Sequence, residues 1–385
     1  MYSIILLSII SSITALQSPL NMDHNPNNNK TMTGNPIIPG WYADPEARIF
    51  TSSNTTKNNQ TPQKQYWLYP TTSAPYDKQT TFDAFSSPDL LTWTKHPHIL
   101  NITRIPWSTN RAAWAPSVTY RDGEYFMYFS VGDGAGIGVA RSVTRRPEGP
   151  FEDVLGRPLV PGVVRGAEGI DAQVFVDYMD PNEDDGGVHG GDGDGEGRNW
   201  LYFGGWGHAI VVELGSDMVS LKGEYKEITP EGYVEGPWIM KRDGVYYFMF
   251  SVGGYVSPSL PFPIPYILYP NLPLYQSANA TADCDNSWGD NSYGVSYVKS
   301  ASPTGPFTTQ PTKILHGNDK VGTGTGHNSI FTPDGKDYYI VYHRRFPNDT
   351  ERDHRVTCVD RMEFDERGDI RPVIITEEGV EGRVL

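Results

Sequence analysis

The chain has 385 residues, a hydrophobic content of 38%, an aromatic content of 12% and a formal net charge of −15 at pH 7. This excess of acidic residues argues against nucleic acid or an anionic membrane as a partner, because both repel a strongly negative protein. The length exceeds that of a typical single core, but a fold that grows by adding repeats can hold such a chain in one domain.

The N-terminal residues predict a segment that directs export. Residues 1–17 contain an apolar run followed by small residues, and the run is too short to span a bilayer, as in a secretory signal peptide. A buried N-terminal strand is the alternative. Residues 18–34 are polar and rich in Asn, which predicts a flexible leader before a single domain over 35–385. We therefore expect a secreted, extracellular protein. Asn-x-Ser/Thr acceptor sites for glycosylation occur at Asn29, Asn54, Asn59, Asn101, Asn279 and Asn348.

The rest of the chain repeats one unit five times. Each unit begins with a short strand and passes through a hairpin into a strand rich in aromatic residues. These aromatic strands lie at 66–69, 125–130, 200–203, 245–250 and 338–342. Three of the hairpins contain an Asp-Gly turn, at 122–123, 243–244 and 334–335, which supplies the positive φ that a tight turn needs.

Two of the units also end on a nearly identical phrase, at 146–151 and 302–307. Self-similar units without helical periodicity predict an all-β fold, a five-bladed β-propeller. A β-sandwich is the alternative, but it does not explain why the phrases repeat.

Three loops interrupt the units. Residues 51–65 predict a polar hairpin tip, and residues 180–198 are rich in Asp and Gly but lack the spacing of an EF-hand, which favours a solvated loop. Residues 255–291 are rich in Pro, Tyr and Leu, and we expect them to pack over the top of the propeller and to wall the site. A surface insertion folded on itself is the alternative.

The chain has two cysteines, Cys284 and Cys358. They can pair in an oxidising compartment, or Cys358 can be a buried thiol on a strand. Two cysteines far apart in sequence do not make a metal site.

The starts of the five units hold the candidate site. In a propeller the inner strands surround a central channel, so their first residues converge at one end of it. Aligning the repeats places the same position at Asp44, Trp114, Asp171, Glu235 and His327. A carboxylate in apolar company, such as Glu235 before Gly-Pro-Trp, is either paired or has a chemical role. The alternative for each acid is a structural carboxylate that ties blades together.

The motifs at these starts resemble glycoside hydrolase family 43, the five-bladed inverting arabinofuranosidases, xylosidases and arabinanases. They are Gly-Trp-Tyr-Ala-Asp-Pro at 40–45, Trp-Ala-Pro-Ser at 114–117, Ile-Asp at 170–171, Val-Glu-Gly-Pro at 234–237 and Gly-His-Asn-Ser at 326–329. The resemblance runs from about residue 35 to residue 380 and includes all five units in order. It implies that Asp44 is the general base, Glu235 the general acid, and Asp171 the residue that orients the acid and tunes its pKa.

Inverting hydrolysis agrees with that assignment. One carboxylate activates water while a protonated carboxyl group donates to the leaving oxygen, with about 6.5–9.5 Å between the two groups. Burial of Glu235 with Asp171 nearby would raise the pKa of Glu235 and keep it protonated, whereas Asp44 needs a polar setting that keeps it ionised.

Three tryptophans are candidates for binding the sugar. Trp41 and Trp114 offer flat rings to the apolar face of a sugar, or else belong to the core. Trp206, in a Gly-Gly-Trp-Gly-His segment, is a candidate for the wall of the pocket.

The resemblance adds two more residues. It implies that Arg361 binds sugar hydroxyls near the acid, the alternative being a salt bridge with Asp360 or Glu363. It also implies that His327 faces a structural calcium ion in the central channel, the alternative being a histidine hydrogen-bonded there without metal. We expect no cofactor to be required for the chemistry.

The expected function is removal of terminal α-L-arabinofuranosyl residues from neutral plant cell-wall polysaccharide or oligosaccharide, by a monomer. No further domain follows the propeller in this chain, which favours this activity over that of a xylosidase. The alternatives within the family are a β-xylosidase and a galactosidase or galactofuranosidase. The alternatives outside it are a retaining fructoside hydrolase, whose carboxylates would lie about 5–5.5 Å apart, and a sugar-binding propeller without catalysis.

Overall fold

A computed structural model of the chain describes residues 31–52, 63–178, 197–253 and 292–385. The predicted signal peptide, most of the predicted leader and Cys284 lie outside these residues, as do the insertion at 255–291 and most of the two polar loops. The described part is almost entirely β, with two short 3-10 turns at η1 (Tyr76–Lys78) and η2 (Ile102–Arg104). None of its helices is long and apolar enough to cross a membrane.

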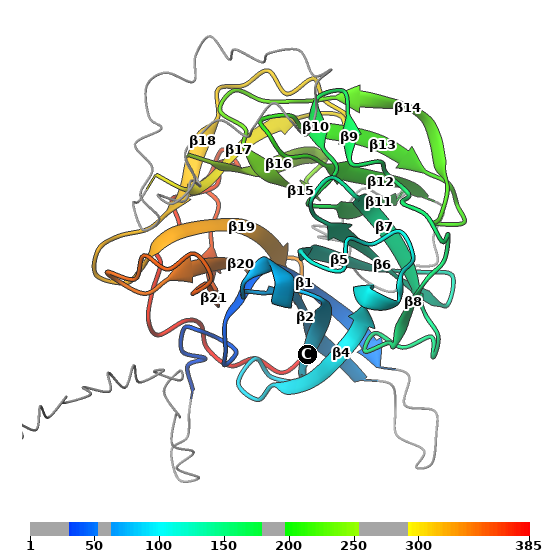
Figure 1. Cartoon of the computed structure of the whole chain (residues 1–385). Coiled ribbons are helices and arrows are strands. Elements are labelled where there is room, and N and C mark those ends of the chain that lie inside the picture. Colours follow the sequence, from blue (N-terminus) through cyan, green and yellow to red (C-terminus); the bar gives the residue numbers. More distant parts are fainter. Residues whose placement is uncertain (1–30, 53–62, 179–196, 254–291) are drawn as a thin grey trace, which may run out of the picture.

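The strands form five sheets that surround a common centre, so the predicted five-bladed β-propeller is confirmed (Figure 1). Blade one contains β1 (Tyr42–Ser52), β2 (Gln63–Thr72), β3 (Thr81–Ser87) and β4 (Thr94–Asn101). Blade two contains β5 (Ala113–Arg121), β6 (Glu124–Val131), β7 (Gly136–Ser142) and β8 (Phe151–Asp153). Blade three contains β11 (Gln173–Tyr178), β12 (Gly197–Phe203), β13 (Ile210–Leu214) and β14 (Leu221–Glu227). Blade four contains β15 (Glu235–Arg242), β16 (Val245–Val252), β17 (Gly294–Ser300) and β18 (Thr312–His316). Blade five contains β19 (Thr323–Phe331), β20 (Tyr338–Arg345) and β21 (Val356–Met362).

Within each blade the strands pair antiparallel in chain order, and the first strand is the innermost. A small separate hairpin of β9 (Val163–Val164) and β10 (Ala167–Glu168) lies between blades two and three. The ring closes between blades five and one, where the Ser329 hydroxyl accepts from the Ala47 amide at 2.9 Å and donates to the Pro45 carbonyl at 2.7 Å. The segment before β1 runs beside β21, and both backbone groups of Val359 bond to the Asn35 side chain.

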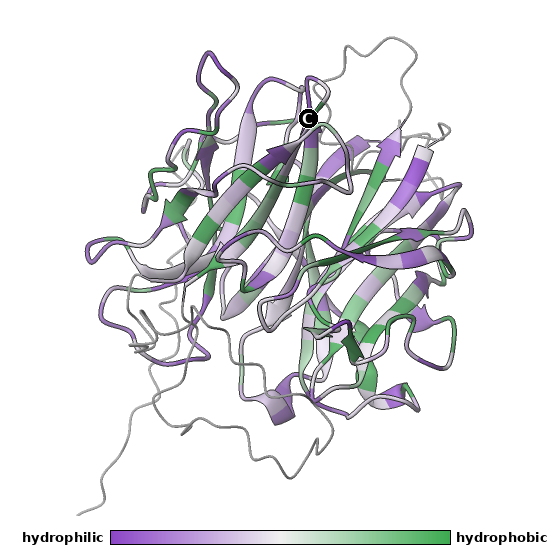
Figure 2. Cartoon of the chain, turned by 90° about the horizontal axis from the view of Figure 1, so that it is seen from above, coloured by the Kyte–Doolittle hydropathy of each residue, from purple (hydrophilic) through white to green (hydrophobic). Residues whose placement is uncertain are grey.

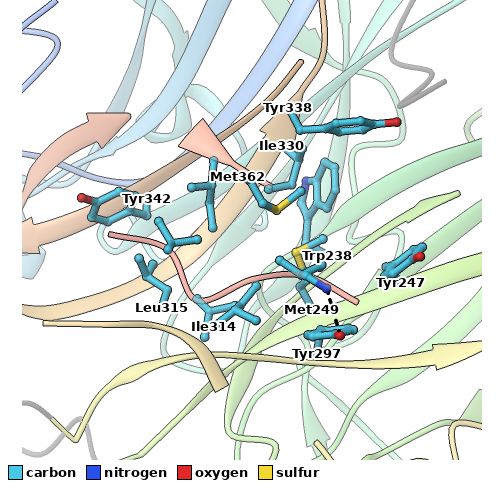
Figure 3. Close-up of a cluster of buried hydrophobic side chains, with 14 of the residues drawn as sticks. Trp238, Tyr247, Met249, Tyr297, Ile314, Leu315, Ile330, Tyr338, Tyr342 and Met362 are labelled. Atoms are coloured by element: carbon cyan, nitrogen blue, oxygen red, sulfur yellow. Dashed lines mark hydrogen bonds between the residues drawn. The ribbon is translucent and has the colours of Figure 1, made fainter. Parts of the chain in front are cut away.

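The apolar core lies between neighbouring blades. Figure 2 shows apolar residues concentrated along the strands and polar residues in the loops that join them. Between blades four and five, Trp238 and Met249 pack against Ile330, Tyr338 and Met362 (Figure 3).

Cys358 belongs to the same cluster and is a buried, free thiol. Burial raises the pKa of the Cys358 thiol to about 12, which makes it chemically inert near neutral pH.

Tyrosine hydroxyls tie each of the first four blades to the next. The aromatic second strand of a blade carries a buried Tyr whose hydroxyl donates to a backbone carbonyl in the outer turn of the following blade. The pairs are Tyr69 with Pro147 (2.9 Å), Tyr128 with Met218 (2.6 Å), Tyr202 with Pro303 (2.6 Å) and Tyr247 with Gly368 (2.6 Å). Pro147 and Pro303 belong to the two repeated phrases, so the repetition reflects a carbonyl presented at the same place in two blades.

A second repeated feature lies at the head of every inner strand. One residue there adopts a positive φ: Asp44 (47°), Ala115 (40°), Asp171 (59°), Gly236 (63°) and His327 (46°). This conformation is strained for residues other than Gly, so the surroundings must hold it in place. In each case the amide of that residue donates to a side chain of the preceding blade. The acceptors, in the same order, are His343, Thr71, Ser130, Asp171 and Ser251.

We predict that Tyr128→Phe lowers the free energy of unfolding by about 1–3 kcal/mol, because it leaves the buried Met218 carbonyl without its donor. Urea unfolding followed by tryptophan fluorescence measures this loss. Tyr225→Phe, on the outer strand β14, is the matched control and should change stability by less than about 0.5 kcal/mol. Equal stability of the Tyr128 variant and the wild-type protein would contradict the role of the tie.

Candidate active site

The repeat alignment selected five residues. Four of them meet at the mouth of the central channel, namely Asp44, Asp171, Glu235 and His327. Asp44, Asp171 and His327 occupy the positive-φ position of their blades. Glu235 and Trp114 instead stand one residue earlier, so the alignment that gave all five the same position is wrong by one residue for these two. The offset directs the Glu235 side chain differently from those of the two aspartates. An acid and a base that act on opposite sides of one bond need such a difference in direction.

Asp44 is a buried carboxylate surrounded by nitrogen atoms. Its Oδ1 lies 3.0 Å from Arg355 Nη1, 3.2 Å from His343 Nδ1 and 3.6 Å from His327 Nδ1. Burial alone would raise the pKa of Asp44, but the Arg355 guanidinium and then the two histidines outweigh it and hold the pKa well below its usual range. Asp44 is therefore ionised at any pH near neutrality.

Asp171 holds the main chain next to Glu235. Its Oδ2 accepts the amide of Gly236 at 3.1 Å, which fixes the backbone that carries the Glu235 side chain. Burial raises the pKa of Asp171 well above its usual range, and the carboxyl group of Glu235 raises it further. The two acids therefore titrate as a pair that retains one proton when a lone carboxyl group would be ionised.

Glu235 is the first residue of β15, and its Oε1 accepts the Tyr293 hydroxyl at 2.8 Å. Burial raises the pKa of Glu235, with a further contribution from the Asp44 carboxylate, while Tyr293 and Arg355 act in the opposite direction. The net effect is a raised pKa, which is the property that a general acid requires.

A fourth acid lies near this group. Glu168, on the small hairpin before blade three, has its pKa raised to about 7 by burial and by the charge of Glu235. Its segment is held by an isolated bridge to Gly205. Glu168 could not be selected from the sequence, because it stands outside the repeated motifs.

Trp114 and Trp41 are both partly buried and already have protein partners. Trp114 Nε1 donates to the Gln79 side chain at 2.5 Å, and Tyr76 meets the indole edge-on with 5.1 Å between ring centroids. Trp41 is stacked on His354 with 4.4 Å between centroids and 9° between planes. The face of Trp41 that covers His354 is therefore not open to a sugar.

Trp206 is the most exposed of the three candidate tryptophans, at 44%. It sits in a turn whose next residue, Gly207, donates its amide to the Val234 carbonyl at 3.1 Å, directly before Glu235. The backbone next to Trp206 is therefore held beside the start of β15, and the ring is partly exposed to solvent.

The structure contradicts the role expected of Arg361. This residue pairs with Tyr339 across β20 and β21, at the end of blade five that is remote from His327, and its guanidinium bonds to Asp337 at 2.5 Å. Its side chain is 55% exposed. The arginine at the site is Arg355, which precedes β21 and contacts Asp44. Both arginines lie close to one strand in sequence, and only the direction of that strand decides which one reaches the channel.

Sequence reasoning missed Arg355, His343 and Tyr293. A signal for His343 was present in the sequence. In three other blades a polar residue near the end of the aromatic strand accepts the amide at the head of the next inner strand, and these residues are Thr71, Ser130 and Ser251. Tyr293 and Arg355 lie just outside the repeated phrases, where no internal comparison could have selected them.

A calcium ion at His327 would need donor atoms from the side chains around it. His327 Nδ1 faces two carboxylates, at 3.6 Å from Asp44 and 3.8 Å from Asp171, and burial lowers the pKa of His327. Calcium prefers six to eight oxygen ligands. Over the described residues, no group of three or more His, Cys, Asp or Glu side chains is arranged to hold a metal ion. The described side chains do not form a direct ligand set for calcium, and the calcium ion near His327, which the resemblance implies is often contacted through water, stays a prediction.

One layer deeper in the channel lies a carboxylate of the structural kind. Glu46 pairs with Arg48, and it also accepts from Trp238 Nε1 at 3.3 Å and from the Ser117 hydroxyl at 3.4 Å. This acid links blades one, two and four. The two kinds of carboxylate are thus separated by depth, with Asp44, Asp171 and Glu235 nearer the mouth.

The chain is similar to a β-D-galactofuranosidase of Aspergillus niger, with 59% identity over 389 aligned residues that cover 97% of this chain and 96% of that protein. It is 26% identical to an arabinoxylan arabinofuranohydrolase of Bacillus subtilis over 67% of this chain and 47% of the relative. A solved structure of an α-L-arabinofuranosidase from Clostridium thermocellum superposes with a TM-score of 0.56 at 24% identity, over 87% of this chain and 95% of that one. This last likeness shows the fold alone.

The family model described as "Glycosyl hydrolases family 43" matches residues 33–182, 191–260 and 279–370, and so covers most of the chain and all five blades. Together with the relative that is 59% identical, this match establishes what the motifs at the strand heads implied: the chain belongs to glycosyl hydrolase family 43.

Proposed function

We propose that this protein is a β-D-galactofuranosidase that hydrolyses the glycosidic bond with inversion at the anomeric carbon. The observation that carries the proposal is the 59% identity with a β-D-galactofuranosidase along nearly the full length of both chains. Membership of a family of glycoside hydrolases supports a carbohydrate substrate. The acids at the channel mouth supply the groups that the reaction needs.

In this proposal Asp44 takes a proton from the attacking water, for which it must be ionised. Its contacts with Arg355 and the two histidines favour that state. Glu235 gives a proton to the leaving oxygen, and its raised pKa favours the protonated state. Asp171 touches neither reacting atom, but it holds the Gly236 amide and so orients Glu235.

The expectation of an α-L-arabinofuranosidase acting on plant cell wall is corrected by the same comparison, because the relative that is 59% identical has a different sugar specificity. The two sugars explain the error. A β-D-galactofuranosyl group has the same ring configuration as an α-L-arabinofuranosyl group and differs by one more hydroxymethylene on its exocyclic arm. The motifs at the strand heads concern the reacting carbon, which is alike in both sugars, and carry no information on that arm.

We predict a higher kcat/KM for 4-nitrophenyl β-D-galactofuranoside than for 4-nitrophenyl α-L-arabinofuranoside, by roughly 10–200-fold, the range that one extra group in a pocket provides. Release of 4-nitrophenol measures both rates. Proton NMR in the first minutes should show the α-anomer of galactofuranose. A preference for the arabinoside would overturn the sugar assignment, whereas release of the β-anomer would overturn the inverting mechanism and leave the sugar assignment intact.

The roles of the two acids can be separated by the leaving group. We expect Glu235→Gln to reduce kcat by about 10²–10⁴-fold on methyl β-D-galactofuranoside but much less on the 4-nitrophenyl glycoside, whose leaving group needs no proton. Asp44→Asn should reduce both rates alike, since water must be activated in either case. Glu152→Gln, on the outer strand β8, is the control for loss of a carboxylate. If the Glu235 variant lost the same factor in kcat on both substrates, Glu235 would not be the general acid.

The pH profile tests Arg355. Its cation lowers the pKa of Asp44 and also that of Glu235. Arg355→Met should therefore raise both pKa values, so that the acid limb and the alkaline limb of kcat/KM both move to higher pH. Arg361→Met, the remote arginine, should leave both limbs in place. Movement of the limbs in opposite directions, or in the Arg361 variant, would contradict this account of the site.

A further inference from the structure

A buried tyrosine connects the two halves of the site. Tyr293 directly precedes β17 and is 2% exposed. Its hydroxyl donates to Glu235 Oε1 at 2.8 Å, and its ring lies parallel to the imidazole of His343, with 5.9 Å between centroids and 11° between planes. His343 Nδ1 in turn lies 3.2 Å from Asp44 Oδ1. One phenol therefore contacts the candidate acid and packs on a residue that contacts the candidate base.

The fold makes room for this ring at one specific residue. A Cβ atom added at Gly326 would lie 2.0 Å from Cε1 of Tyr293, so no side chain fits there. Gly326 immediately precedes His327, which is the place that Glu235 and Trp114 occupy in their own blades. Blade five thus carries no side chain at a position where two other blades carry functional candidates, and the ring of Tyr293 fills the space.

The position of Tyr293 is also fixed from its own strand. Val252 pairs with Gly294 at the base of the β16–β17 hairpin. Just beyond that pair, a Cβ atom at Gly253 would lie 2.0 Å from the Ser292 carbonyl oxygen. The backbone on both sides of Tyr293 is therefore held closely, and this places the ring so that its hydroxyl reaches Glu235.

We propose that Tyr293 is a positioning residue that determines which oxygen of Glu235 carries the catalytic proton. A phenol that donates to Oε1 makes Oε1 the acceptor, so the proton of the neutral acid resides on Oε2. Because Tyr293 is almost fully buried, its hydroxyl acts on the reaction through Glu235 and not by direct contact with the substrate. This inference rests on the proposed role of Glu235 as general acid.

The same hydrogen bond limits how far the pKa of Glu235 is raised. Burial raises the pKa of Glu235, and a donor to its carboxylate opposes that rise because it favours the ionised form. The acid therefore stays protonated at working pH and can still release its proton in the transition state. A ring that only filled space would leave both the proton and the pKa unaffected.

Tyr293→Phe removes the donor and keeps the ring, the stack on His343 and the fit against Gly326. We expect kcat to fall by roughly ten-fold, a part of the about 10²–10⁴-fold that a general acid contributes, with KM unchanged. The alkaline limb of kcat/KM should move to higher pH while the acid limb stays, unlike the Arg355 variant, in which both move. Tyr297→Phe, in the same strand with its hydroxyl on Asp369, is the control and should move neither limb. An unshifted alkaline limb in an active Tyr293→Phe enzyme would overturn the proposal.

A double-mutant cycle tests the contact with Gly326. Gly326→Ala should displace the ring and reduce kcat, whereas the same change in a Tyr293→Ala background should have little further effect, because the clash is gone. Additive losses would show that the glycine serves another purpose and would contradict the coupling.

A measurement without substrate separates this inference from the proposed function. In the full chain labelled with ¹³C at the Glu carboxyl carbons, the Glu235 resonance is identified by its loss in Glu235→Gln and is then titrated. Its midpoint should lie at higher pH in Tyr293→Phe than in the wild-type protein. A shifted midpoint with no turnover of galactofuranosides would reject the substrate and keep the hydrogen bond. An unshifted midpoint would reject the positioning role whatever the substrate.

Discussion

The site depends on the balance between one guanidinium and three carboxylates, of which Asp44 and Asp171 are buried and Glu235 is partly buried. Asp44, Asp171 and Glu235 share the mouth of the channel, and Arg355 is the arginine that contacts them, through Asp44. A single cation can stabilise one ionised acid, and a second buried charge nearby is costly. The remaining two acids therefore keep a proton between them. The protonated state that a general acid needs follows from this imbalance of charge, and it requires no special group beyond the pair itself.

The architecture was predictable because its causes are local. Hairpin turns, aromatic strands and the repeated closing phrase are each visible in a few residues, and five occurrences in order leave few other folds. The acids were found in the same way, by their place in the repeat. The one-residue offset of Glu235 was not predictable, because the positive φ falls on Asp, Ala, Gly and His in different blades and has no fixed letter. Arg361 was selected from the resemblance, and Arg355 was missed because the sequence does not show at which end of its blade β21 begins.

The sugar could not be read from the motifs for a different physical reason. In the proposed function the strand heads surround the reacting carbon, and the chemistry there is the same for every furanoside of matching configuration. Contacts with the exocyclic arm would then decide the specificity, and we expect them to come from segments outside the repeat. Glu168, in the small β9–β10 hairpin, and Trp206, in a turn, are candidates for such contacts, since neither is on an inner strand. Such segments vary without disturbing the blades, so one fold can serve several sugars.

The way the ring closes has a consequence for the order of the blades. The two ends of the described chain run side by side: the Thr33 amide donates to the Val380 carbonyl at 2.8 Å, and that of Gly34 to the Glu378 carbonyl at 2.8 Å. Among the described residues, no blade combines a strand from the N-terminal part of the chain with one from the C-terminal part, because every sheet is built from consecutive strands. The polypeptide is therefore nearly a circle, opened at one seam between blades five and one. Joining that seam and cutting the chain between two other blades would preserve every contact at the channel mouth, so the catalytic arrangement is a property of the cyclic order and is independent of the blade at which the chain starts.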